Sequence, residues 1–232
     1  MPVRRLTHQS CGQVQAQSRV RNEAGAEVSR RRARTYNWIT NRDAYPMSDT
    51  ALIVIDLQRD YFAGGKSPLP GIERTVERAA QLIALFRTSG VPVIHVRHVE
   101  KDPAVGILLE GTPGAEIDPR VAPQGEDMLI TKHYPNAFRD TTLAKALHVL
   151  GAKELFFCGA MSNLCVDATV RAAFDMGYHC TVIEDACAAS DLEFGGDVIP
   201  ATLVHGAFMA ALASAYGEVV DLKTFSERLV TG

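Results

Sequence analysis

The sequence predicts an α/β protein, a three-layer Rossmann-like fold in which helices cover both faces of a mainly parallel sheet. Two observations lead to this prediction. Short apolar runs typical of buried strands alternate with longer stretches whose apolar residues recur at helical spacing. Right-handed crossovers between such strands produce a parallel sheet covered by helices. The 232 residues, 47% of them hydrophobic, suffice for one large domain with an additional tail.

Residues 1–46 differ in composition from the rest of the chain. They hold nine arginines against three acidic residues, no lysine and no hydrophobic period, so we interpret them as a disordered or loosely attached, non-catalytic tail. Three alternatives stay open, namely an organelle transit peptide, a basic contact patch at 30–34 and a start codon assigned upstream of Met47. The domain itself is expected to span residues 47–232.

The first half of the domain is expected to contain two strands and one helix. Residues 50–56 form a continuous apolar run of the kind that is buried on both faces of a parallel sheet. A helix is predicted over 72–89 and a second strand over 91–97. Residues 98–127 contain several Gly and Pro residues and little periodicity, so they form a long connection. Connections of this length inside a domain are more often functional than not.

The second half repeats the alternation of strand and helix. The predicted elements are a strand over 128–131, a helix over 141–150, a strand over 154–158, a helix from Cys165 to about Gly177, a strand over 179–184, a helix over 199–216 and a strand over 217–221.

Three reactive residues stand just beyond three of these strands. Asp56 ends the first strand, Lys132 follows the third, and Cys165 follows the 154–158 strand after a polar turn. Taken singly, they have structural interpretations as a cap, a solvated charge and a buried small side chain. Ligands bind beyond the carboxyl ends of parallel strands, so we expect the three residues to converge there. A thiol on the first turn of a helix lies at the positive end of its dipole, which predicts a favoured thiolate.

Five motifs follow one another along the domain. They are Val-Ile-Asp-Leu-Gln-Arg-Asp-Tyr-Phe at 54–62, Gly-Thr-Pro-Gly-Ala-Glu-Ile at 111–117, Lys-His-Tyr-Pro-Asn-Ala-Phe at 132–138, Gly-Ala-Met-Ser-Asn-Leu-Cys-Val at 159–166 and Glu-Asp-Ala at 184–186. In this order they resemble the isochorismatase-like cysteine hydrolase superfamily, and the resemblance covers roughly residues 50–225.

The resemblance implies a catalytic triad of Asp56, Lys132 and Cys165. It also implies a cis peptide between Ala160 and Met161, with the N–H groups of Met161 and Cys165 facing the carbonyl oxygen of a substrate. The chemistry of the residues agrees, because a carboxylate beside a thiol serves as base and then as acid, while a lysine holds that carboxylate and favours the thiolate. Two preorganised N–H donors stabilise a tetrahedral oxyanion.

The substrate side of the pocket is expected to include Gln58, Phe62, His98, Tyr134 and Phe138, although the three aromatic residues fit a core equally well. The nicotinamidase branch of the superfamily binds a metal through an Asp-x-His pair. This chain has no such pair after its second strand, so we expect neither a metal nor another cofactor, and we doubt that nicotinamide is the substrate.

These observations predict a cysteine-dependent hydrolase of a C–N bond in a small amide, carbamoyl or ureido compound, acting through an acyl-thioester. One alternative is a vinyl ether hydrolase of the isochorismatase type. Another is a non-catalytic module, in which Cys165 is a redox sensor or the pocket only binds a ligand. The resemblance also implies a homo-oligomer.

Charge and cysteine content limit the partners and the location. A formal net charge of −3 and a pI near 6.2 give no reason to expect nucleic acid or an anionic membrane as a partner. No apolar run approaches the length needed to span a bilayer. The five cysteines are odd in number and lack zinc-site spacing, so a reducing compartment is the simpler interpretation and we expect a cytoplasmic protein.

Overall fold

The computed structural model describes residue 45 and residues 47–229. The predictions made for residues 1–44 and 46 therefore lie outside the described residues. Among the residues that are described, no helix is both long and apolar enough to cross a membrane.

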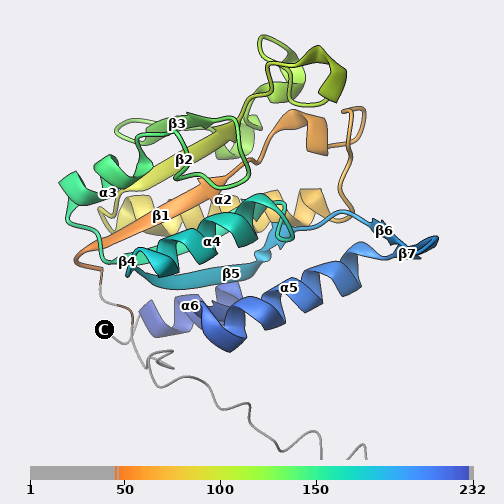
Figure 1. Cartoon of the computed structure of the whole chain (residues 1–232). Coiled ribbons are helices and arrows are strands. Elements are labelled where there is room, and N and C mark those ends of the chain that lie inside the picture. The colour runs from red at the N-terminus through yellow and green to blue at the C-terminus, as the bar shows by residue number, and fades with distance from the viewer. Residues whose placement is uncertain (1–44, 46, 230–232) are drawn as a thin grey trace, which may run out of the picture. The chain divides into compact units, whose positions relative to one another are not determined.

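The sheet has six parallel strands in the order β3-β2-β1-β4-β5-β8 (Figure 1). The strands are β1 (Thr50–Ile55), β2 (Val93–His98), β3 (Met128–Lys132), β4 (Glu154–Ala160), β5 (His179–Ala188) and β8 (Glu218–Val220). The four strands β3, β2, β1 and β4 are consecutive, so the chain segments that leave their carboxyl ends are neighbours at one edge of the sheet.

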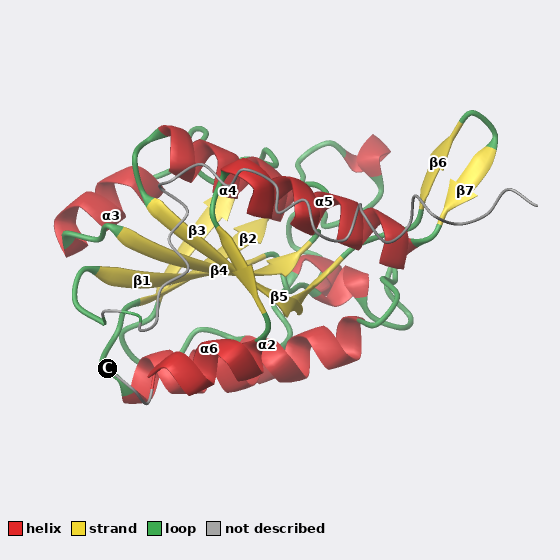
Figure 2. Cartoon of the chain, turned by 90° about the horizontal axis from the view of Figure 1, so that it is seen from below, coloured by secondary structure: helices red, strands yellow, loops and turns green. Residues whose placement is uncertain are grey.

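Helices cover both faces of this sheet, which confirms the three-layer α/β prediction (Figure 2). The helices are α2 (Ile72–Thr88) and α6 (Leu222–Leu229) on one face, and α3 (Leu143–Leu150), α4 (Cys165–Asp175) and α5 (Ala201–Ala215) on the other. The central strand β1 serves both cores. Leu52 and Val54 belong to the core beneath α2, whereas Ile53 and Ile55 belong to the core beneath α4, as a continuous apolar strand requires.

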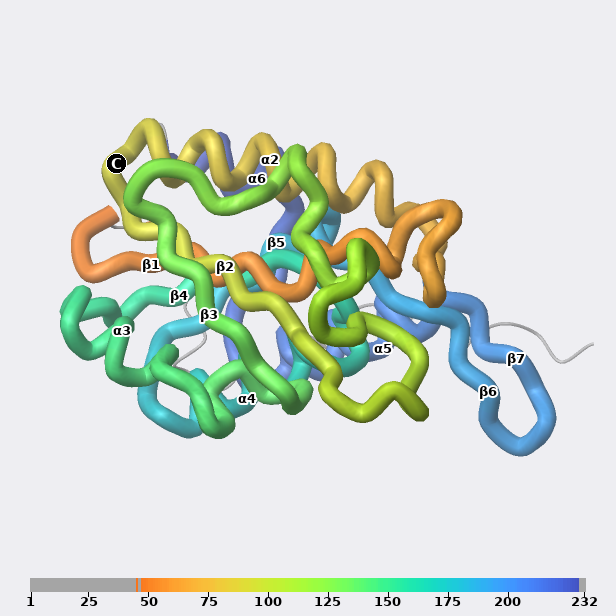
Figure 3. Tube along the Cα trace, turned by 90° about the horizontal axis from the view of Figure 1, so that it is seen from above, coloured from red at the N-terminus to blue at the C-terminus, as the bar shows by residue number. Residues whose placement is uncertain are grey.

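Figure 3 traces the long connection between β2 and β3 from yellow to green. It contains three short 3-10 turns and no α-helix. The turns are Pro103–Val105, Pro113–Ala115 and Pro119–Val121, each of which begins with proline. Proline at the first position of a turn lacks a donor that would be unsatisfied there, and it presets φ. The connection therefore runs over the surface as a series of turns, as its Gly and Pro content predicts.

Two parts of the fold were not predicted. An antiparallel hairpin of β6 (Leu192–Phe194) and β7 (Asp197–Ile199) lies between β5 and α5, and α6 follows β8. The helix predicted over 199–216 begins at Ala201, because Ile199 belongs to β7 and Pro200 is the N-cap residue. The buried ring of Tyr45, which lies inside the range assigned to the tail, packs edge-on against Phe156 at a centroid distance of 5.2 Å.

Candidate active site

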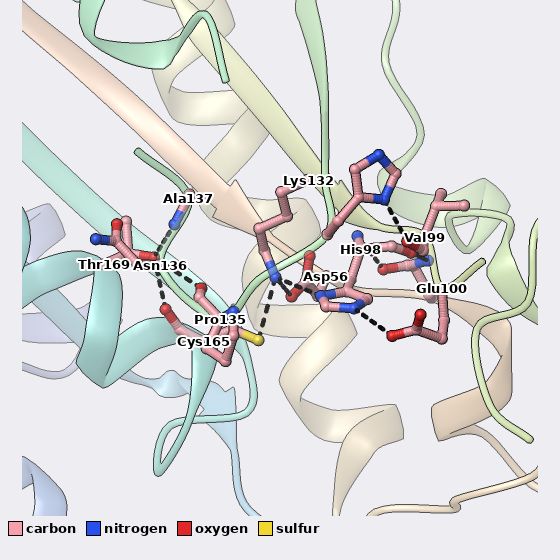
Figure 4. A network of polar contacts seen from close by, with 12 residues as sticks. Asp56, His98, Val99, Glu100, Lys132, Pro135, Asn136, Ala137, Cys165 and Thr169 are labelled. Atoms are coloured by element: carbon pink, nitrogen blue, oxygen red, sulfur yellow. Dashed lines mark hydrogen bonds and ion pairs between the residues drawn. The ribbon is translucent and has the colours of Figure 1, made fainter. Parts of the chain in front are cut away.

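The carboxyl edge of the sheet brings Asp56, Lys132 and Cys165 together (Figure 4). Asp56 directly follows β1, Lys132 is the last residue of β3, and Cys165 is the first residue of α4, the helix after β4. Asp56 has a φ of 49°, a left-handed conformation that Asp adopts more readily than most residues. The predicted convergence of these side chains is present in the structure.

Gly159 permits the close approach of β4 to β1. It is paired with Ile55, and a Cβ atom at position 159 would lie 1.9 Å from the carbonyl oxygen of Ile55. Its φ of 131° is also one that residues with a side chain rarely adopt. Any other residue here would push β4 away from β1. The turn after β4, which places Cys165 near Asp56, would move away as well.

The ammonium group of Lys132 stands at the centre of the cluster. Its Nζ atom lies 2.6 Å from Oδ2 of Asp56, 3.2 Å from Sγ of Cys165 and 3.1 Å from Nδ1 of His98. The side chain is completely buried. Burial alone would lower the pKa of Lys132, but the nearby Asp56 and Cys165 outweigh burial and raise it. The charged form of Lys132 is therefore favoured, and it lies against the Asp56 carboxylate inside the protein.

The surroundings of Cys165 oppose the thiolate that its place at the start of a helix favours. Burial, and after it the negative charge of Asp56, raises the pKa of Cys165 to about 12. Lys132 lowers it, although by too little to reverse the shift. The sequence predicted support for the thiolate from the helix dipole and from Lys132, but it does not show how completely the sulfur is buried. Attack by Cys165 on a substrate therefore requires a base that takes the thiol proton, and the Asp56 carboxylate is beside it.

The turn between β4 and α4 contains a cis peptide bond between Ala160 and Met161. Among the described residues, neither the Met161 N–H nor the Cys165 N–H donates to a backbone carbonyl. Both donors of the expected oxyanion hole are thus available to another acceptor.

Ser162 ties this turn to the neighbouring elements. Its N–H donates to the carbonyl of Ala188 at 2.7 Å, which fastens the turn to the end of β5. Its Oγ atom lies 3.0 Å from Nδ1 of His205 on α5, and Nε2 of His205 lies 3.3 Å from a carboxylate oxygen of Glu184. Ser162 lies within the 159–166 motif and His205 on α5, and the sequence predicted no role for either because their contact joins distant segments.

Gln58 has a different role from the one expected. Its side chain is fully buried, and its amide bonds the backbone of the long connection. Oε1 accepts from the His98 N–H at 2.8 Å, and Nε2 donates to the carbonyls of His98 and Ala115, both at 2.7 Å. The amide is committed to these groups, so Gln58 holds the connection in place rather than offering an amide to a substrate.

The three aromatic residues expected in the pocket also have protein partners. Phe62 is buried with the Arg120 guanidinium 5.2 Å from its ring, and Phe138 is buried at a centroid distance of 6.2 Å from Tyr178. Phe138 is therefore a core residue. Tyr134 is half-buried and lies under the guanidinium of Arg139. Of the five expected substrate contacts, His98 makes a polar contact with the triad, to Nζ of Lys132.

Comparison with known proteins identifies the family. The family model "Isochorismatase domain" matches residues 50–222. The chain belongs to the isochorismatase family. An uncharacterised isochorismatase family protein of Bacillus subtilis is 44% identical, with 76% of this chain and 98% of that protein covered. An isochorismatase structure from Pseudomonas putida has a TM-score of 0.73 and 38% identity, with 78% of this chain and 92% of that chain covered. Maleamate amidohydrolase of Pseudomonas putida is 29% identical, with 77% and 86% covered. Like its named relatives, this member of the family is a hydrolase.

A metal ion does not fit the cluster, although Asp56, His98 and Cys165 place one ligand atom each within 4.8 Å of one another. The Lys132 ammonium contacts all three of these side chains. A divalent cation placed among them would lie against the buried Lys132 ammonium, and repulsion between the two charges opposes its binding.

Tyr61 is a further residue near the triad that was not predicted. It is buried, and burial raises the pKa of its phenol, with the charges of Asp56 and Cys165 adding to the shift. It stands between Asp60 and Phe62 in the first family motif, so the motif itself contained the signal.

Proposed function

We propose that the protein is a cysteine-dependent amidohydrolase that cleaves the C–N bond of a small amide, carbamoyl or ureido compound. One observation carries this proposal, namely that Cys165 Sγ, an Asp56 carboxylate and the Lys132 ammonium meet in one buried cluster. A nucleophile, a base and a cation in contact are the parts that acyl transfer through a thioester requires.

In the first half of the reaction, Asp56 takes the proton of the Cys165 thiol as sulfur attacks the substrate carbonyl carbon. The oxyanion that forms accepts hydrogen bonds from the Met161 and Cys165 N–H groups. The tetrahedral intermediate collapses, the C–N bond breaks, and the Asp56 carboxyl group donates its proton to the departing nitrogen. The products are a Cys165 thioester and an amine or ammonia.

In the second half, water hydrolyses the thioester. The water oxygen attacks the thioester carbon while Asp56, again a carboxylate, takes a proton from the water. The C–S bond then breaks, and the Cys165 sulfur recovers a proton from the Asp56 carboxyl group. The nearby Asp56 and Cys165 raise the pKa of Lys132, which favours its charged form. It therefore orients the carboxylate and stabilises negative charge on sulfur without transferring a proton itself.

Similarity to maleamate amidohydrolase of Pseudomonas putida supports C–N bond hydrolysis, since that relative is named an amidohydrolase. The raised pKa of Cys165 disfavours the alternative of a thiol redox sensor, because such sensors rely on a thiolate near neutral pH.

A panel of small amides, carbamoyl compounds and ureido compounds, assayed for ammonia release, tests the proposal. We expect Cys165→Ala to lower kcat/KM by about 10⁴-fold or more and Asp56→Asn by about 10²–10⁴-fold. Cys180→Ala is the matched control, because Cys180 is a buried free cysteine on β5 away from the cluster. Equal activity in Cys165→Ala and Cys180→Ala would overturn the proposal.

The vinyl ether alternative has its own outcome in this experiment. A protein that cleaves isochorismate, releases no ammonia from the panel and keeps substantial activity as Cys165→Ala is an isochorismatase in the chemical sense. Cleavage of a vinyl ether does not require a sulfur nucleophile.

We also propose that the protein forms a homo-oligomer. Phe194 and Val198 on the hairpin and Leu203 on α5 are large, exposed apolar side chains in neighbouring segments, which a second copy would cover. Light scattering of the wild type and of Phe194→Glu measures the mass of each. A monomeric wild type would overturn this proposal.

The cytoplasmic location stays a prediction.

A further inference from the structure

The amidohydrolase mechanism leaves His98 unexplained, although it touches the centre of the triad. An ammonium group has three N–H donors, and Lys132 has three polar contacts, of which two are Asp56 and Cys165. The third is Nδ1 of His98 at 3.1 Å. His98 is the last residue of β2 and is paired with Lys132, the last residue of β3, so the sheet register places the two side by side (Figure 4).

The contact with Lys132 fixes the tautomer of His98. Because an ammonium only donates, Nδ1 must be the accepting nitrogen and the ring proton must lie on Nε2. Nε2 lies 3.7 Å from Oε2 of Glu100. The other carboxylate oxygen of Glu100 accepts from the N–H groups of Lys101 at 2.9 Å and Asp102 at 3.2 Å, so the carboxylate is anchored.

The backbone of His98 is held as firmly as its ring. Gln58 bonds both the N–H and the carbonyl of His98, at 2.8 and 2.7 Å. The backbone that carries the His98 ring is therefore fixed in place. The ring directs one acceptor nitrogen at Lys132 and one N–H toward Glu100.

We propose that His98, with Glu100 behind it, is the positioning residue that fixes the Lys132 ammonium between Asp56 and Cys165. The proposal rests on the amidohydrolase function and adds a residue to it. Without the acceptor at Nδ1, one buried N–H of Lys132 has no partner, and the ammonium turns or shifts to find one. A shift of this kind changes the orientation of the Asp56 carboxylate that takes the thiol proton, so it lowers kcat.

The arrangement requires a neutral imidazole. A protonated His98 has no lone pair at Nδ1 and places a second cation 3.1 Å from Lys132. The groups that face His98 are Lys132 from β3, Asp56 from the end of β1, Cys165 from α4 and Glu100 from the connection. Burial and then Lys132 lower the pKa of His98 below its ordinary value near 6.5, against the opposite effects of Asp56 and Glu100. The ring is therefore neutral at pH 7 and gains a proton only in more acidic solution.

Three substitutions separate positioning from a general structural role. In His98→Asn, the side-chain oxygen takes the place of Nδ1 and accepts from Lys132, but it does not titrate. His98→Gln places its amide near the position of Nε2, and His98→Ala removes both nitrogens. His148→Ala is the control, because His148 is an exposed histidine on α3.

The experiment measures kcat and KM on the best amide of the panel from about pH 5 to pH 8. We expect His98→Ala and His98→Gln to lower kcat on the order of 10²-fold with little change in KM. His98→Asn should recover most of that loss, and its fall in kcat/KM at acid pH should begin at a lower pH than in the wild type. Glu100→Gln should move the acid limb to lower pH as well, because Glu100 favours the protonated ring. A His98→Ala enzyme with wild-type kcat, or pH profiles that coincide, would overturn the proposal.

A second measurement does not depend on turnover. Long-range ¹H–¹⁵N correlation of the imidazoles should show His98 with its proton on Nε2 and a pKa that rises in Lys132→Met, since a neighbouring cation is removed. A proton on Nδ1 would overturn the proposal even in an active enzyme. If the wild type hydrolyses no amide, the amidohydrolase function fails while this spectrum still decides the contact.

Discussion

The Nζ atom of Lys132 lies 2.6 Å from Oδ2 of Asp56, and neither side chain has any exposed surface. Opposite charges in such a place depend on each other, because removal of one leaves the other buried without a counter-charge. The pair therefore contributes to folding as well as to chemistry.

We expect Lys132→Met to lower the free energy of unfolding by about 3–5 kcal/mol near neutral pH. Urea unfolding of the wild type and of the variant at pH 7 measures this difference.

Lys153→Met is the control for this prediction. Lys153 forms an ion pair of similar length with Asp49, at 2.9 Å, but both side chains are exposed. Solvent screens this pair, so its loss should leave the unfolding curve nearly unchanged. If the two variants unfold at the same urea concentration, burial of the Lys132–Asp56 pair has no effect on stability and the prediction is wrong.

The succession of strands and helices along the chain and the meeting point of the triad followed from the sequence, because continuous apolar runs identify strands that are buried on both faces. Asp56 and Lys132 end two such runs, and the edge at which parallel strands end does not depend on loop structure. The hairpin β6–β7 was missed because its three-residue strands are largely exposed and show no alternation, although its Gly195-Gly196 turn is a hairpin signal.

What the sequence does not contain is the environment of each side chain. Gln58 is expected in the pocket from the sequence, yet the partners of its side chain lie 40 and 57 residues away in the chain. The pKa of Cys165 depends on how completely the folded protein excludes water from its sulfur, and the helix that begins at Cys165 gives no measure of that. Glu100 and His98 are separated by one residue, but their role depends on Lys132 from another strand.

Gly114 offers a steric test of the connection between β2 and β3. A Cβ atom at this position would lie 2.1 Å from Oδ1 of Asp60, whose carboxylate accepts from the Leu108 N–H at 2.7 Å and the Lys66 N–H at 3.2 Å. We expect Gly114→Ala to displace Asp60, to lower the free energy of unfolding by about 1–3 kcal/mol and to reduce amide hydrolysis.

Gly206→Ala is the matched control. Gly206 lies within α5 with no atom near its missing Cβ, so alanine there should raise the free energy of unfolding by about 0.5–1 kcal/mol.

Urea unfolding and the amide assay, applied to both glycine variants, check these signs. A Gly114→Ala protein as stable and as active as the Gly206→Ala protein would show that the connection yields to the added methyl group. Asp60 would then have no part in holding it.

Cys165 provides a chemical test of the resting enzyme. Its pKa of about 12 means that little thiolate is present near neutral pH, so iodoacetamide should react slowly there. The rate should rise about tenfold per pH unit across the range in which the protein stays folded, because only the thiolate reacts.

Asp56→Asn should react faster than the wild type at the same pH, because loss of the carboxylate charge lowers the pKa of Cys165. Mass spectrometry of the modified peptide follows the reaction, and Cys165→Ala gives the background from the other buried cysteines, Cys158, Cys180 and Cys187. Complete reaction of one equivalent below pH 7 in the wild type would mean that the resting residue is a thiolate. Asp56 would then have no thiol proton to remove, and its part in the reaction would begin only when the leaving nitrogen needs a proton.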